Sequence, residues 1–182
     1  ILLLILVIIS IFIIFDSYLQ FFTGKNTFGL EINFSRVSSI FGSELILGSF
    51  LLKLLPIIFF LFYYSKIQTK KYYLVSTLFL SFYFSVIYIA AGRTPFFLML
   101  LFIILAIFFI KDLRKILYSS LLILIIFIFS TFLFEFGKFN PGKRIFFQTY
   151  NQIAKHLQIQ KKPKITNEKK NELNNEIKIF PN

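Results

Sequence analysis

The chain has 182 residues, of which 57% are hydrophobic and 20% aromatic, and its mean hydropathy is +0.78. This composition is typical of a membrane protein and excludes a soluble enzyme, a disulfide-stabilised secreted domain and a disordered tail. The net charge of +12 lies in short hydrophilic gaps and in the C-terminal segment, and there is no cysteine for thiolate chemistry, metal binding or disulfides. Because the chain begins inside an apolar run, we expect it to be a piece of a longer polypeptide.

Five apolar segments approach or reach the ~20 residues that a membrane-spanning helix needs. They are 1–15, 45–64, 72–91, 96–110 and 117–134. The sequence therefore predicts an all-α, polytopic transmembrane bundle over 1–134 with about five spans. Residues 135–182 are rich in Lys, Asn, Gln and Glu, with a turn expected at Asn140-Pro141-Gly142. We predict that this basic polar segment begins a large outer loop.

Alternate gaps between the spans lie on opposite sides of the membrane, and their charges differ. The gaps 65–71 and 111–116 carry six Lys and Arg residues in thirteen positions, whereas 16–44 and 92–95 carry three in thirty-three. The positive-inside rule places the first pair of gaps in the cytoplasm. The loops 16–44 and 92–95 and the tail 135–182 are then predicted to lie outside it.

The fourth predicted span begins on the outer side, after Gly92-Arg93-Thr94-Pro95. Thr94 is a residue type that caps helices, and proline suits a first turn. A helix start offers free N–H groups and a partial positive charge, and Arg93 adds a forked cation, so the sequence predicts a phosphate site here. The alternative is that Arg93 only solvates a tight turn. Ser43-Glu44 predicts a second helix start on the same side.

Polar residues inside the spans give two further predictions. One group recurs at helical spacing and is expected to face other helices: Thr77, Ser81, Ser85 and Tyr88. Lys53 lies near the middle of the second span, where a charge costs ~3 kcal/mol or more unless it is paired or hydrated. Lys53 is therefore expected either to line a cavity with an anionic partner or to reach the interface by snorkelling.

The outer loop 16–44 mixes aromatic residues, glycines and hydrogen-bonding groups with few charges, which favours a structured loop folded onto the bundle. This loop and the next span carry a distinctive set of residues: Asp16, Gln20, Gly24, Phe28-Gly29, the run 36–44, Gly48, Leu51 and Pro56. Together with Arg93-Thr94, and more loosely with 144–149, this set resembles the O-antigen ligase and polymerase family of bacterial envelope membrane proteins.

The resemblance implies a glycosyltransferase that takes a glycan from a polyprenyl pyrophosphate at the periplasmic side of the bacterial inner membrane. It joins this glycan to an acceptor glycan or glycolipid without a metal or cofactor. Arg93, Arg36 and Thr94 would bind the pyrophosphate, where cations stabilise the charge on the leaving group. Gln20 and Lys25 would belong to a substrate-binding loop. Membrane lipids are expected partners, and nucleic acid is not.

The sequence assigns no catalytic residue. His156 does not match the family's motif, and we expect the general base to lie outside this chain. A ligase and a polymerase fit equally well. Two other functions stay open, namely a transporter or flippase for polysaccharide or lipid-linked sugar with Lys53 lining its path, and a non-catalytic membrane assembly subunit.

Overall fold

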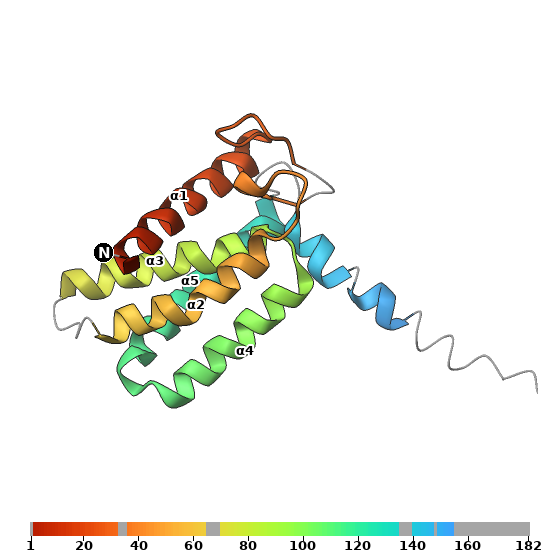
Figure 1. Cartoon of the computed structure of the whole chain (residues 1–182). Coiled ribbons are helices and arrows are strands. Elements are labelled where there is room, and N and C mark those ends of the chain that lie inside the picture. The colour runs from red at the N-terminus through yellow and green to blue at the C-terminus, as the bar shows by residue number, and fades with distance from the viewer. Residues whose placement is uncertain (1, 33–35, 65–69, 135–139, 148, 155–182) are drawn as a thin grey trace, which may run out of the picture. The chain divides into compact units, whose positions relative to one another are not determined.

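The computed structural model describes residues 2–32, 36–64, 70–134, 140–147 and 149–154. Its long helices, shown in Figure 1, are α1 (Leu2–Thr23), α2 (Leu47–Tyr64), α3 (Lys70–Ile89), α4 (Arg93–Phe109) and α5 (Arg114–Phe134). Three short helices are η1 (Ser39–Phe41), η2 (Lys111–Leu113) and η3 (Lys143–Phe147). Apart from isolated bridge residues, such as the pair Lys25 and Glu31, the regular elements of the described residues are all helical, so the predicted all-α class is confirmed.

Four helical stretches are long and apolar enough to cross a membrane. They are Ile5–Thr23, Leu47–Tyr64, Lys71–Ile89 and Lys111–Leu133. Helix α4 is equally apolar but has 17 residues and is about 26 Å long, slightly less than the ~20 residues of a typical span. The described residues therefore contain four candidate membrane spans and one shorter apolar helix.

Helix α3 packs against each of the other four long helices. Its predicted polar stripe, Thr77, Ser81, Ser85 and Tyr88, is buried as expected. The hydroxyl of Ser85 is hydrogen-bonded to that of Tyr18 in α1, and the Tyr83 hydroxyl donates to the Leu51 carbonyl in α2 at 2.6 Å. Because lipid offers no hydrogen-bond partners, such contacts fix how neighbouring helices pack.

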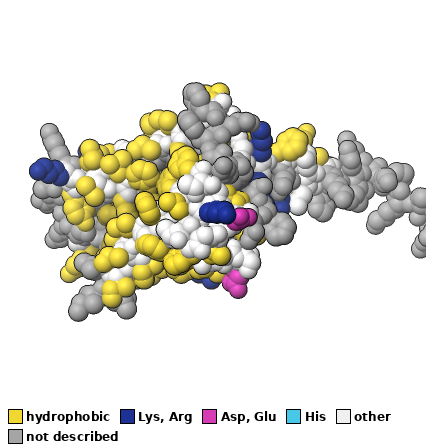
Figure 2. All heavy atoms as spheres, turned by 90° about the horizontal axis from the view of Figure 1, so that it is seen from above, with side chains coloured by type: hydrophobic (Ala, Val, Ile, Leu, Met, Phe, Trp, Pro, Cys, Tyr) yellow, Lys and Arg dark blue, Asp and Glu magenta, His cyan; other side chains and the backbone are white. Residues whose placement is uncertain are grey.

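The helix faces directed away from α3 are apolar and exposed. Phe60, Leu101, Phe108 and Phe129 expose between 52% and 73% of their surface. In Figure 2, apolar side chains cover most of the helical surface in view. Large exposed patches of this kind mark a membrane-contacting surface.

Three predicted boundaries differ from the structure. Helix α1 continues through 16–23, so the outer loop begins at Gly24 instead of at residue 16. The helix can continue because the polar residues of this stretch are buried against the loop and α3. Helix α2 begins at Leu47, not at Ser43-Glu44. Helix α4 begins at Arg93 after the N-cap Gly92, so the prediction that Thr94 caps it is wrong.

The chain divides into two compact units, 1–147 and 148–182. Residues 140–147 thus belong with the helical bundle, whereas the predicted boundary falls after residue 134. The second unit is described only at 149–154, where it is helical. His156 and most of the predicted basic tail lie outside the described residues.

Candidate functional site

The carboxylate of Asp16, in the second half of α1, is fully buried. It accepts hydrogen bonds from the backbone N–H and the hydroxyl of Thr27, at 2.8 and 2.6 Å, and from the hydroxyl of Ser39. Ser39 has a φ of 51°, a left-handed conformation that costs ~1–2 kcal/mol for a residue with a side chain. Asp16 therefore holds two points of the loop 24–44 on α1.

Gln20 lies one turn further along α1 and is also fully buried. Its amide oxygen accepts from the N–H groups of Ser38 and Ser39, at 3.0 and 2.7 Å. Its amide nitrogen donates to the carbonyls of Leu30 and Glu31, at 3.1 and 3.3 Å. Buried backbone groups need such partners, so Gln20 organises the loop. Its predicted contact with substrate stays a prediction.

Lys25 lies at the exposed tip of this loop. Its ammonium group pairs with Glu31 at 3.1 Å, and the two side chains are 63% and 70% exposed. An ion pair this exposed contributes ~0–1 kcal/mol to stability. Lys25 and Glu31 therefore close the tip with balanced charge.

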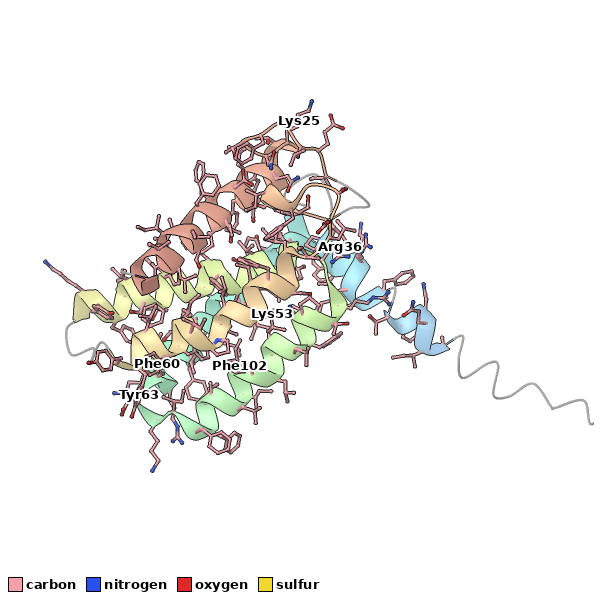
Figure 3. The ribbon with its side chains drawn as sticks, viewed as in Figure 1. Lys25, Arg36, Lys53, Phe60, Tyr63 and Phe102 are labelled. Carbon is pink, nitrogen blue, oxygen red and sulfur yellow. The ribbon has the colours of Figure 1, made fainter. Side chains whose placement is uncertain are left out.

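Arg36 lies where the loop returns to the helices, at the end of the bundle that we call the loop end (Figure 3). Its Nε donates to the carbonyl of Ala90 at 3.1 Å, and its Nη2 donates to that of Leu45 at 3.1 Å. Ala90 directly follows α3, and Leu45 precedes α2, so Arg36 connects two helix ends. These bonds use two of the five N–H donors of the guanidinium group, which leaves three for a ligand.

The guanidinium group of Arg36 lies against Gly92, the N-cap of α4. A Cβ atom at Gly92 would stand 3.1 Å from Nη2 of Arg36 and 2.7 Å from Cγ of Pro95. Only a glycine leaves room for this close approach. Arg36 thereby reaches the start of α4, where Arg93 is the first residue.

Three arginines come together at the loop end. Burial, and then the positive charges of Arg144 and Arg93, lower the pKa of Arg36, and burial and the charge of Arg93 lower the pKa of Arg144. Neither Arg36 nor Arg144 forms an ion pair with a carboxylate of the described residues. Partly buried like charges that repel one another are stabilised by an anion. We call Arg36, Arg93 and Arg144 the arginine cluster.

A short helical stretch after α5 carries Arg144 into this cluster. Asn140 is its N-cap, because the Asn140 side-chain oxygen accepts from the backbone N–H of Lys143 at 3.2 Å. The side-chain nitrogen of Asn140 donates to the carbonyl of Thr131 in α5 at 3.0 Å. Pro141 follows at the first helical position. The predicted turn at Asn140-Pro141-Gly142 is therefore a helix start.

Gly142 fixes this stretch against α3 and α5. A Cβ atom at Gly142 would overlap the ring of Phe132 and stand 2.9 Å from the hydroxyl oxygen of Tyr88. The Tyr88 hydroxyl is hydrogen-bonded to Thr131 at 2.9 Å and to the backbone of Gly142. Ile145 is fully buried. The backbone at Gly142 therefore packs where no larger residue fits.

The predicted site residues Arg36 and Arg93 thus lie together, and Thr94 is exposed beside Arg93 in the first turn of α4. Gln20 and Lys25 belong to the adjoining loop. Arg144 was missing from the predicted site. The sequence signal for it is that Arg144 is one of four arginines in a chain that otherwise uses lysine among its 20 basic residues.

Comparison of the chain with protein-family models, curated proteins and solved structures finds no match. The family resemblance of the loop and of Arg93-Thr94 therefore stays a prediction. The arginine cluster is the feature on which a function can be argued.

Lys53 is exposed on α2. A groove of about 570 Å³ lies between α2 and α4, and its wall on α2 begins one turn after Lys53, at Pro56. Lys53 shares the helical stripe of Pro56, Phe60 and Tyr63 but is not among the residues that line the groove. Lys53 forms no ion pair with a carboxylate of the described residues.

Proposed function

We propose that this chain is part of a membrane glycosyltransferase of bacterial envelope polysaccharide assembly, of the O-antigen ligase or polymerase type. The enzyme joins a polyprenyl-pyrophosphate-linked glycan to an acceptor glycan or glycolipid. The arginine cluster supports this proposal most strongly, because guanidinium groups bind phosphoryl oxygens through paired hydrogen bonds. Its place at one end of an apolar bundle suits a substrate whose pyrophosphate group lies at the membrane surface.

In this reaction the bond between the anomeric carbon and the pyrophosphate oxygen breaks, and the acceptor hydroxyl oxygen bonds to that carbon. The hydroxyl proton passes to a general base. The bonding electrons leave with the polyprenyl pyrophosphate, so negative charge on it increases. Arg36, Arg93 and Arg144 would stabilise that charge, and they act more strongly in a partly buried site than in water.

The proposed topology has five spans, with the loop end on the periplasmic side of the inner membrane. The starts of α3 and α5 lie at the same end of the bundle, because the Tyr73 hydroxyl donates to the Lys115 carbonyl at 3.2 Å. Since α3 ends and α4 begins at the loop end, α4 has to run the full length of the bundle to reach the start of α5. This connectivity supports the proposal that α4 also crosses the membrane, in addition to the four longer candidate spans, although it has only 17 residues. The basic residues Lys71, Lys111 and Lys115 at the opposite end favour a cytoplasmic location there.

Single substitutions in the arginine cluster test this proposal. In the full-length protein, Arg93→Ala and Arg144→Ala should each lower the rate of glycan joining about 10²- to 10³-fold, because each removes a donor to the developing charge. The assay is transfer of a labelled glycan from its polyprenyl-pyrophosphate donor in isolated membranes.

The matched control is Lys143→Ala, which removes a neighbouring exposed cation outside the arginine cluster. Protein content and membrane insertion should be the same in all variants. Unchanged joining by Arg93→Ala would reject the assigned role of the cluster.

A further inference from the structure

The groove between α2 and α4 opens at the end of the bundle away from Arg36, as Figure 3 shows for Phe60, Tyr63 and Phe102. Its lining residues are Pro56, Phe59, Phe60, Tyr63, Phe102, Phe109, Ile110, Lys111 and Asp112. The wall on α2 extends about 10 Å along the helix. Phe60 is 58% exposed and Phe109 is 81% exposed, so the groove is open to the surrounding bilayer. Its walls therefore suit an extended hydrocarbon chain.

The mouth of the groove is a fixed turn that presents two opposite charges. Arg114 holds this turn, because its Nε donates to the Ile107 carbonyl at 2.7 Å and its Nη2 donates to the Phe108 carbonyl at 3.1 Å. Carbonyls in the last turn of a helix otherwise lack partners. Lys111 and Asp112 are adjacent on η2 and both are exposed. Neither forms an ion pair with another described residue.

We infer that this groove binds phosphatidylethanolamine, a phospholipid with a negative phosphate and a primary ammonium group. One acyl chain lies along the aromatic walls, Lys111 binds the phosphate, and Asp112 accepts hydrogen bonds from the ammonium group. A phospholipid with an anionic headgroup would bring negative charge to Asp112. A quaternary ammonium headgroup, as in phosphatidylcholine, has no N–H to donate. This site is separate from the arginine cluster, and the inference does not depend on the proposed function.

Tryptophan fluorescence tests this inference, because the chain has no natural tryptophan. The Phe60→Trp variant of the full chain places a single indole in the groove and is reconstituted in phosphatidylcholine vesicles. Brominated phosphatidylethanolamine, phosphatidylglycerol or phosphatidylcholine is then added in rising mole fraction, since bromine quenches indole on contact. We expect half-maximal quenching at about a threefold lower mole fraction of the ethanolamine lipid than of the choline lipid, because only the ethanolamine headgroup adds an N–H hydrogen bond to the exposed Asp112 carboxylate.

Two substitutions in the Phe60→Trp background separate the headgroup contacts. Asp112→Asn should abolish the preference for the ethanolamine lipid over the choline lipid, because it removes the anionic acceptor for the ammonium group. Lys111→Gln should leave the preference for the ethanolamine lipid over the choline lipid unchanged, because both lipids carry the phosphate. Phe109→Trp gives a second reporter in the same groove if Phe60→Trp folds poorly.

The control reporter is Tyr118→Trp on α5, which is 58% exposed and does not line the groove. It lies four residues from the start of α5, as Phe60 lies four residues from the end of α2, so both reporters are about 6 Å from a helix end. Tyr118→Trp should be quenched equally by the three lipids. Equal quenching at Phe60→Trp, preferential quenching there by phosphatidylglycerol, or no quenching by any lipid would each overturn the inference.

Discussion

Gln20 accepts and donates hydrogen bonds at the same time, and its amide does so at any pH because it carries no titratable proton. Its oxygen faces two N–H groups, and its nitrogen faces two carbonyls. The geometry of the loop beside Arg36 therefore depends on one buried, uncharged side chain. Asp16 contributes as well, because its buried carboxylate accepts hydrogen bonds from three donors of the loop.

Exchanging the amide of Gln20 for a carboxylate tests this dependence. Gln20→Glu keeps the side-chain shape but turns an acceptor toward the carbonyls of Leu30 and Glu31. We expect a loss of about 2–4 kcal/mol in unfolding free energy, because two carbonyls lose their donor and a charge is buried. Thermal unfolding in detergent, followed by circular dichroism, measures it. The isosteric control Glu31→Gln at the exposed loop tip should cost ~0–1 kcal/mol, and equal losses for the two variants would contradict the assigned role of Gln20.

Sequence patterns identified Asp16, Gln20 and Arg36 as members of one set, but they did not give the partners of these residues. Gln20 bonds to Ser38 and Ser39, and Arg36 bonds to Ala90. Such pairings depend on where the loop meets the helix ends, which is a property of the folded chain. Composition alone shows only that these residues can form hydrogen bonds.

At the scale of elements, the stretch 140–147 acts as a rigid support for Arg144. Its N-cap Asn140 donates a hydrogen bond to the Thr131 carbonyl of α5, and Gly142 packs against the ring of Phe132 in the same helix. The stretch begins with residue types that favour a helix start, and its buried Ile145 anchors it. The position of Arg144 therefore follows from packing around Gly142.

Gly142→Ala should displace this support, because the added methyl group overlaps the ring of Phe132. We expect affinity for inorganic pyrophosphate to fall about tenfold or more, as in Arg144→Ala, while helix content stays the same. The concentration dependence of the thermal midpoint in detergent measures the affinity. If Gly142 acts through Arg144, the double variant Gly142→Ala/Arg144→Ala should bind no more weakly than Arg144→Ala. Additive losses would show that Gly142 does not act by positioning Arg144.

Hydrophobic runs were sufficient to locate all five long helices, but not their ends. Helix α1 continues through Asp16 and Gln20 because tertiary partners bury these polar side chains. Helix α4 begins at Arg93 because Gly92 takes the cap position that Thr94 was predicted to fill. Helix ends are set by local capping and by contacts with other elements, and hydropathy records neither of these.

At the scale of the whole molecule, the absence of cysteine from the sequence makes the proposed orientation directly measurable. Thr94→Cys places one exposed thiol at the loop end, and Lys115→Cys places one at the opposite end. In spheroplasts, a membrane-impermeant maleimide should label Thr94→Cys from outside and Lys115→Cys only after permeabilisation. The reverse labelling pattern would place the arginine cluster in the cytoplasm and contradict the proposed reaction.

The orientation can be predicted from the sequence, because the positive-inside rule requires only the positions of the spans and of the basic residues between them. The convergence of the arginine cluster cannot be read in this way. Arg36, Arg93 and Arg144 belong to a loop, a helix start and a stretch beyond the last long helix. Their proximity depends on the packing of α3 against its neighbours.

The position of Arg144 after α5 has a consequence for biosynthesis. The loop and α4 leave the ribosome before residues 140–147 do, so a partly inserted chain presents only two of the three guanidinium groups to the membrane surface. The arginine cluster is completed only when α5 has left the translocon and the following stretch has packed against the bundle. If the proposed function holds, nascent chains stalled earlier should bind lipid-linked pyrophosphate weakly, and capture of the donor should require a fully inserted bundle.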